Sequence, residues 1–135
     1  MSILVVGSVA YDTVETPFGR AERVLGGSAS FFSVAAVSFK TDRLVGGVGH
    51  ASAEERLAPV FLGNIDPVLQ RQVLEQVERP RVVACDTMNF WIHGKPAEVR
   101  ETLKKVQILL INDQEARDLS GEWNLVKAAR AIRAM

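Results

Sequence analysis

Short runs of apolar, β-branched residues alternate along the chain with segments of helical periodicity. Residues 3–9 are almost continuously apolar, which is typical of a strand buried on both faces. Similar runs predict four further strands, at residues 43–48, 60–62, 82–85 and 108–111. Strands that are separated by helices favour a parallel sheet with right-handed crossovers. The pattern therefore predicts an α/β fold, a mostly parallel sheet with helices on both faces.

The segments between these runs carry the helical signals. Residues 28–39 are rich in Ala, Val and Phe, which predicts a buried helix. Asp66 followed by Pro67 is typical of a helix start, with Asp as the N-cap and Pro at the first helical position. Three more helices are predicted, at residues 96–106, 113–119 and 125–132.

One segment near the N-terminus predicts a β-hairpin. Residues 13–16 and 22–25 flank Pro17-Phe18-Gly19, a sequence typical of a turn. An unpaired hairpin exposes sheet edges that favour pairing with another chain. We therefore expect a homodimer through residues 13–25.

Composition narrows the class of protein. The 135 residues, of which 47% are apolar and 24% charged, are enough for a single domain over residues 1–135 with a real core. A formal net charge of zero argues against nucleic acid or an anionic membrane as a partner. Cys85 is the only cysteine, so no intrachain disulfide can form. With neither a signal-peptide pattern nor a membrane-length apolar run, the sequence favours a cytoplasmic location.

Polar side chains follow most of the predicted strands. Ligands of parallel sheets bind beyond the carboxyl ends of the strands, where these side chains are expected to gather. The simpler alternative is that Asp and Asn favour turns and helix caps. The residues in question are Asp12, Asn64, Asp66, Asp86, Asn112 and Asp113.

Gly26-Gly27-Ser28 lies where a strand is expected to lead into a helix. Two glycines allow the backbone to approach a ligand closely, and free N–H groups at a helix start favour anions or hydroxyl oxygens. The alternative is a strand-to-helix turn with Ser28 as the N-cap.

Asn112 and Glu115 have the spacing of a capping box, which is a purely structural device. The functional alternative assigns Glu115 to Mg²⁺, which commonly uses few carboxylates and keeps several waters. Three other nucleotide or hydrolase motifs are absent: the P-loop, the G-x-G-x-x-G fingerprint and the G-x-S-x-G elbow. A P-loop kinase and a Rossmann dehydrogenase are therefore disfavoured.

Three segments, taken in order, resemble the front half of ribokinase-type (PfkB family) sugar or nucleoside kinases. They are residues 3–12, 24–30 and 109–116. The resemblance implies a Rossmann-like, ribokinase-like three-layer sandwich in which the hairpin at 13–25 is a lid remnant. It also implies transfer of the γ-phosphate of ATP to a hydroxyl of a small sugar or nucleoside, with Mg²⁺ as a cofactor.

The same resemblance implies site residues. Asp12, Gly26, Gly27 and Ser28 would bind the substrate, while Asn112 and Glu115 would bind the nucleotide, with Glu115 serving the metal. A further segment, Asp86, Asn89 and Trp91, is similar to a D-x-x-N-x-W motif of some family members.

The chain also departs from the family pattern. Phe31 and Phe32 stand where members often carry an Asn, and residues 49–59 replace the rest of the lid, as an internal deletion would. The family's G-A-G-D motif and catalytic Asp would lie beyond Met135, so no catalytic residue is assigned and no kinase turnover is expected of the chain alone. The alternatives are a non-catalytic small-molecule binding module and a shortened α/β domain without a ligand.

Overall fold

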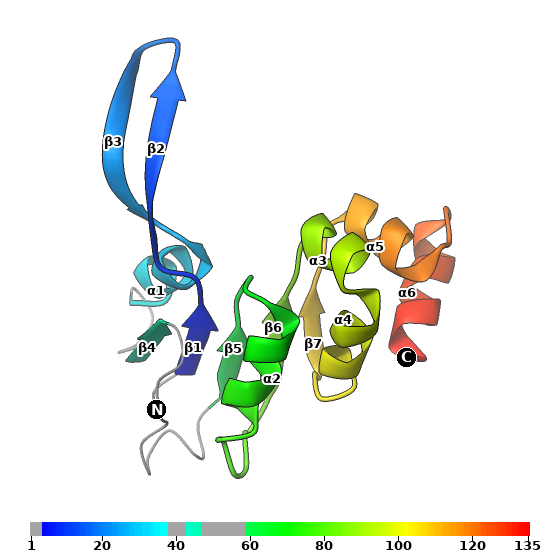
Figure 1. The fold of residues 1–135 in the computed structure, drawn as a ribbon. Helices are drawn as coiled ribbons and strands as arrows, with labels where there is room; N and C mark the ends of the chain where they lie inside the picture. The colour runs from blue at the N-terminus through cyan, green and yellow to red at the C-terminus, as the bar shows by residue number, and fades with distance from the viewer. Residues whose placement is uncertain (1–3, 38–42, 47–58) are drawn as a thin grey trace.

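The computed structural model describes residues 4–37, 43–46 and 59–135 and shows an α/β fold (Figure 1). Its main sheet has five strands in the order β4-β1-β5-β6-β7, and each neighbouring pair is parallel. The predicted fold class is thus confirmed. The strands are β1 (Leu4–Gly7), β4 (Arg43–Gly46), β5 (Val60–Leu62), β6 (Val83–Asp86) and β7 (Ile108–Leu110).

The helices follow the predicted order, with one addition. They are α1 (Ser28–Val37), α2 (Pro67–Leu74), α3 (Asn89–Gly94), α4 (Pro96–Leu103), α5 (Asp113–Ser120) and α6 (Leu125–Arg133). The sequence pattern missed α3, because six residues are too few for a helical period to appear. The ends of the predicted strand 43–48 and helix 28–39, and most of segment 49–59, lie outside the described residues.

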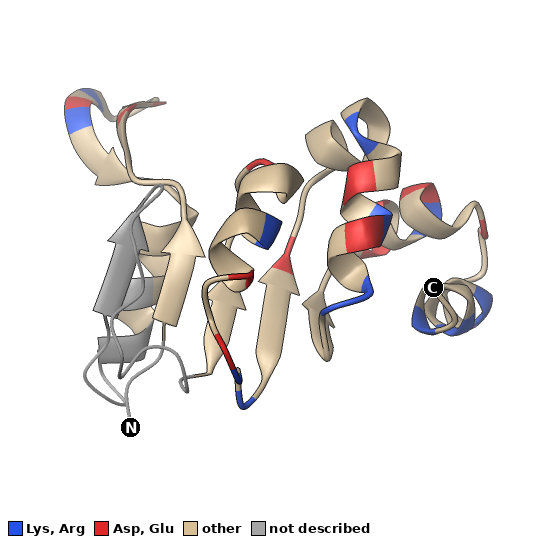
Figure 2. Ribbon diagram, turned by 60° about the horizontal axis from the view of Figure 1, so that its bottom comes forward, with Lys and Arg blue, Asp and Glu red and all other residues tan. Residues whose placement is uncertain are grey.

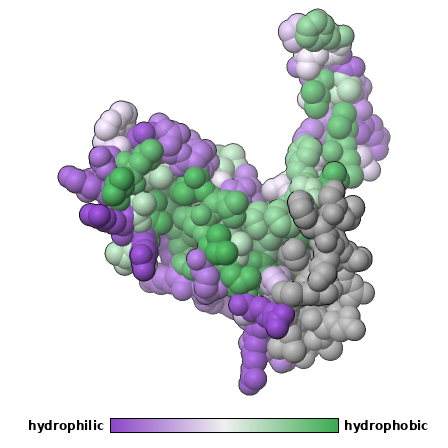
Figure 3. All heavy atoms as spheres, turned by 180° about the vertical axis from the view of Figure 1, so that it is seen from behind, coloured by the Kyte–Doolittle hydropathy of each residue, from purple (hydrophilic) through white to green (hydrophobic). Residues whose placement is uncertain are grey.

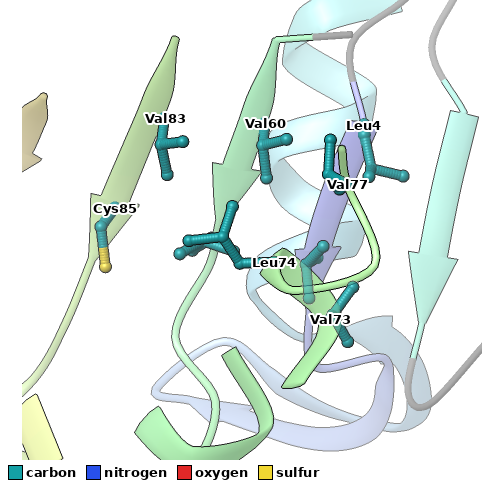
Figure 4. Packing of buried hydrophobic residues seen from close by; sticks show 9 residues of the cluster. Leu4, Val60, Val73, Leu74, Val77, Val83 and Cys85 are labelled. Atoms are coloured by element: carbon teal, nitrogen blue, oxygen red, sulfur yellow. The ribbon is translucent and has the colours of Figure 1, made fainter. Parts of the chain in front are cut away.

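The largest core cluster lies between one face of the sheet and α2 (Figure 4). Strand residues alternate in direction, so every second residue of β1, β5 and β6 points to this face. Each side chain of the cluster is less than 10% exposed. The cluster consists of Leu4, Val6, Val60, Leu62, Val73, Leu74, Val77, Val83 and Cys85.

The opposite face of the sheet is covered by α1 over β1 and β5. Val5 and Phe61 pack there against Ala29, and the ring of Phe32 stacks on Phe61 with centroids 4.0 Å apart. The strand residues farther along this face are less covered, since Ile108 and Leu110 of β7 are half exposed. Figure 3 shows apolar atoms spread over the back of the molecule as seen in Figure 1.

A third cluster joins the helices beside β7. Ile92 of α3, Val99 of α4 and Leu119 of α5 are all buried together.

None of the helices in the described part of the chain has the length and apolar character of a membrane span.

The predicted hairpin is confirmed and projects away from the sheet (Figure 1). Its strands are β2 (Ala10–Thr16) and β3 (Gly19–Gly26), and all of its residues except Gly26 are exposed. The antiparallel register shifts between Asp12 and Val14, where Arg23 on β3 adopts a left-handed φ of 57°. This bulge separates the outer hairpin from the part that adjoins α1.

Candidate functional site

The candidate site is built where β1 ends and α1 begins. The Ser28 N–H donates to the Ser8 Oγ at 3.0 Å, and the Ser8 N–H donates to the Ser28 Oγ at 3.2 Å. The Ala29 N–H also donates to the Ser8 carbonyl, at 3.1 Å. These bonds hold the N-terminus of α1 against the carboxyl end of β1.

Gly26 and Gly27 both lie close to neighbouring atoms, and at Gly27 the backbone leaves no room for a side chain. A Cβ atom at Gly26 would lie 1.8 Å from the Asp12 Oδ2, and one at Gly27 would lie 2.3 Å from the Ser8 carbonyl oxygen. Gly27 also has a φ of +99°, a conformation that favours glycine. The Asp12 carboxylate therefore lies directly on the Gly26 backbone.

The structure thus brings all four predicted substrate residues together: Asp12, Gly26, Gly27 and Ser28. Asp12 was expected just after the first strand, but it is the third residue of β2, because β1 stops at Gly7 and the chain continues into the hairpin. Its carboxylate lies against Gly26, at the end of the neighbouring strand β3.

The carboxyl end of β5 closes the other side of the junction. The Ser28 Oγ donates to the Asn64 carbonyl at 3.2 Å, and a Cβ at Gly63 would lie 2.9 Å from the same Oγ. The Asn64 side chain is turned elsewhere, since its Oδ1 accepts the Trp91 Nε1–H at 2.9 Å. Asn64 therefore contributes its backbone, with its side chain anchoring α3.

Asp66 and Asp86 follow β5 and end β6, but their environments differ. Asp66 caps α2 by accepting the Val68 N–H at 2.9 Å and pairs with the Lys95 Nζ at 2.5 Å. The hydrogen bond from Lys95 holds the pKa of Asp66 below its usual value. Burial instead raises the pKa of Asp86, with a hydrogen bond from the Thr87 backbone acting in the opposite direction. The Asp66 carboxylate is therefore occupied by the helix cap and the ion pair, a structural role that requires no ligand.

Asn112 and Glu115 form the capping box that their spacing predicts. The Glu115 N–H donates to the Asn112 Oδ1 at 2.9 Å, and the Asn112 N–H donates to the Glu115 Oε2 at 3.2 Å. Glu115 is only 8% exposed. Within residues 4–37, 43–46 and 59–135, no group of three or more His, Cys, Asp or Glu side chains is placed to hold a metal ion. The role of Glu115 toward Mg²⁺ stays a prediction.

The two predicted groups of site residues share one edge of the sheet but are not in contact. Asp12 and its neighbours adjoin β1, while Asn112 follows β7, with β5 and β6 between them. Three strand spacings amount to about 14 Å. A ligand at one group would therefore need an extended shape to reach the other.

Sequence reasoning missed Ser8, although it completes the junction. Its signal was available, because Ser8 directly follows Gly7 at the end of a buried strand. The partner of its hydroxyl lies 20 residues farther along the chain and leaves no local pattern.

No family model matches the sequence, and no curated protein matches it. The ribokinase resemblance therefore depends on the motifs and their arrangement.

Proposed function

We propose that this chain is the substrate-binding part of a ribokinase-like sugar or nucleoside kinase. The observation that carries the proposal is the Asp12 carboxylate lying on the Gly26 backbone, beside Gly27 and the start of α1. A carboxylate accepts hydrogen bonds from hydroxyl groups. The Ser28 and Ala29 N–H groups at the start of α1 are already bonded to Ser8, so the Asp12 carboxylate is the group proposed to bind the ligand. A small polyol or the ribose of a nucleoside supplies the hydroxyl groups that it would accept from.

Asn112 and Glu115, at the other end of the sheet, support a role in binding ATP less directly. The Glu115 Oε2 takes part in the capping box, whereas the Oε1 has no hydrogen-bond partner within the described chain. One free carboxylate oxygen is compatible with Mg²⁺ held largely through waters. When bound, Mg²⁺ would neutralise charge on the phosphates of ATP. Glu115 is the residue proposed to hold Mg²⁺, and Asn112 and Glu115 are those proposed to bind ATP.

A non-catalytic binding module is the second candidate. It is favoured by the same capping box, which accounts for Asn112 and Glu115 without any ligand. Under this reading Asp12 and the Gly26-Gly27 backbone bind a polyol, and no phosphate is transferred.

Ligand-dependent thermal stabilisation tests the shared part of both candidates. D-ribose, D-fructose and adenosine should each be titrated separately, because stabilisation grows with ligand concentration only where the folded state binds. A saturable rise in Tm with one of the three is expected. Three flat titrations would contradict the proposed substrate class.

A further inference from the structure

A cavity lies beside β7, at the opposite end of the sheet from Asp12. It has a volume of about 550 Å³, is bordered by α4, β7, α5 and α6, and is open to solvent, since Leu125 on its wall is 44% exposed. This volume is typical of small-molecule sites. Its walls are mainly aliphatic, with side chains that include Leu103, Leu109, Ile111, Leu125 and Ile132.

Two basic side chains lie at this cavity. Among the described residues that line it, Lys104 and Arg133 are the ones with a charged side chain. Lys104 pairs with Glu101 at 2.6 Å, whereas Arg133 has no ion pair within the described chain. Lys127 and Arg130 add further positive charge along α6 (Figure 2).

Aliphatic walls and an unpaired guanidinium match one class of ligand. The apolar walls favour a hydrocarbon body, because burying it removes apolar surface from water. The guanidinium of Arg133 favours a carboxylate, which it can bind through two parallel hydrogen bonds. We propose that the cavity binds a small anionic amphiphile, an aliphatic carboxylate whose tail lies against α4 and β7 and whose head pairs with Arg133. This site shares no residue with the one proposed above.

Isothermal titration calorimetry with sodium octanoate and with octan-1-ol tests the proposal, because the two probes differ mainly in the charge of the head group. We expect saturable binding of octanoate that is tighter than that of octan-1-ol. Arg133→Gln should weaken octanoate binding by about tenfold or more, because the charge-assisted hydrogen bonds to the head group are lost, and should leave octan-1-ol unchanged. Arg130→Gln is the matched control, because Arg130 lies on the same helix but does not line the cavity.

A second variant tests the location. Ala129 lines the cavity, and Ala129→Phe should place a ring in it and weaken binding of both probes. If circular dichroism shows that this variant is unfolded, the comparison of Arg133→Gln with Arg130→Gln still decides.

Four results would overturn the proposal. They are no saturation by octanoate, equal affinities for the two probes, equal effects of the two arginine variants, and unchanged binding by a folded Ala129→Phe variant.

Discussion

Ser8 and Ser28 each donate a backbone N–H to the hydroxyl oxygen of the other, at 3.2 and 3.0 Å. This reciprocal pair of hydrogen bonds joins the end of β1 to the start of α1. It therefore also holds the Gly26-Gly27 segment, which directly precedes Ser28, in place. Both partners are short side chains, so the geometry leaves little freedom.

Ser28→Ala should destabilise the fold by about 1–2 kcal/mol, because it leaves the Ser8 N–H without its acceptor and the Asn64 carbonyl without its donor. Urea denaturation measures the change. Ser30→Ala is the matched control on the same helix, since the buried Ser30 Oγ has no hydrogen-bond partner within the described chain. That variant should be neutral or slightly stabilising. Equal losses in the two variants would show that the reciprocal bonds contribute nothing specific.

Glu115→Gln separates the structural role of Glu115 from its proposed role toward Mg²⁺. Glutamine at this position can keep the capping box, so the Tm should change little. The loss of charge should weaken binding of Mg²⁺ with ATP, measured by titration with the metal present and absent. Unchanged metal-dependent nucleotide binding, or none in the wild type, would favour the non-catalytic module.

Cys85 predicts a loss of stability in alkaline solution. Burial raises the pKa of its thiol to about 12. The unfolded chain loses this proton more readily, since an unperturbed cysteine has a pKa of about 8.5. The contribution of the protonated thiol to the free energy of unfolding is therefore complete below about pH 8.5 and is lost as the pH rises toward about 12. Between pH 8 and pH 10 the free energy of unfolding should therefore fall by about 2 kcal/mol through this group.

Cys85→Ala isolates the thiol from the other groups that titrate in this range. The variant should be less stable at pH 8, because it leaves a small cavity, but its stability should fall less steeply up to pH 10. Parallel curves for the two proteins, from urea denaturation at each pH, would contradict the assignment.

The exposed hairpin predicts self-association. Val14, Val24 and Tyr11 are each more than a third exposed on β2 and β3, which form a sheet of only two strands. The mass from light scattering should rise above 14.8 kDa with concentration. Val14→Lys should return it to the monomer value, whereas Leu69→Lys on α2 should not. A monomer mass at every concentration would be evidence against the dimer.

Local signals predicted the elements that depend on neighbouring residues. The Asp66 cap, the Asn112 capping box and the turn at Pro17-Phe18-Gly19 each involve residues only a few positions apart, and each is confirmed. The prediction of a helix to Val106 was too long, since α4 ends at Leu103. Val106 follows the apolar period because it packs against the core, although it lies in the turn before β7.

Contacts between distant segments could not be read from the sequence. The Ser8 bond to Ser28 and the Trp91 bond to Asn64 depend on strand order, which brings together residues 20 and 27 positions apart. The same is true of Asp12, whose contact with Gly26 requires the hairpin register. The motifs indicated which residues matter, and the sheet determines which of them meet.

The most direct test of the proposed substrate site is calorimetric titration of D-ribose, D-fructose and adenosine into the wild type, Asp12→Asn and Glu15→Gln. Glu15 is the matched control, an exposed carboxylate on β2 that does not lie on Gly26. We predict that one of these compounds binds the wild type and Glu15→Gln alike and that Asp12→Asn abolishes its binding. Binding that survives in Asp12→Asn, or that is absent from the wild type, would contradict the account.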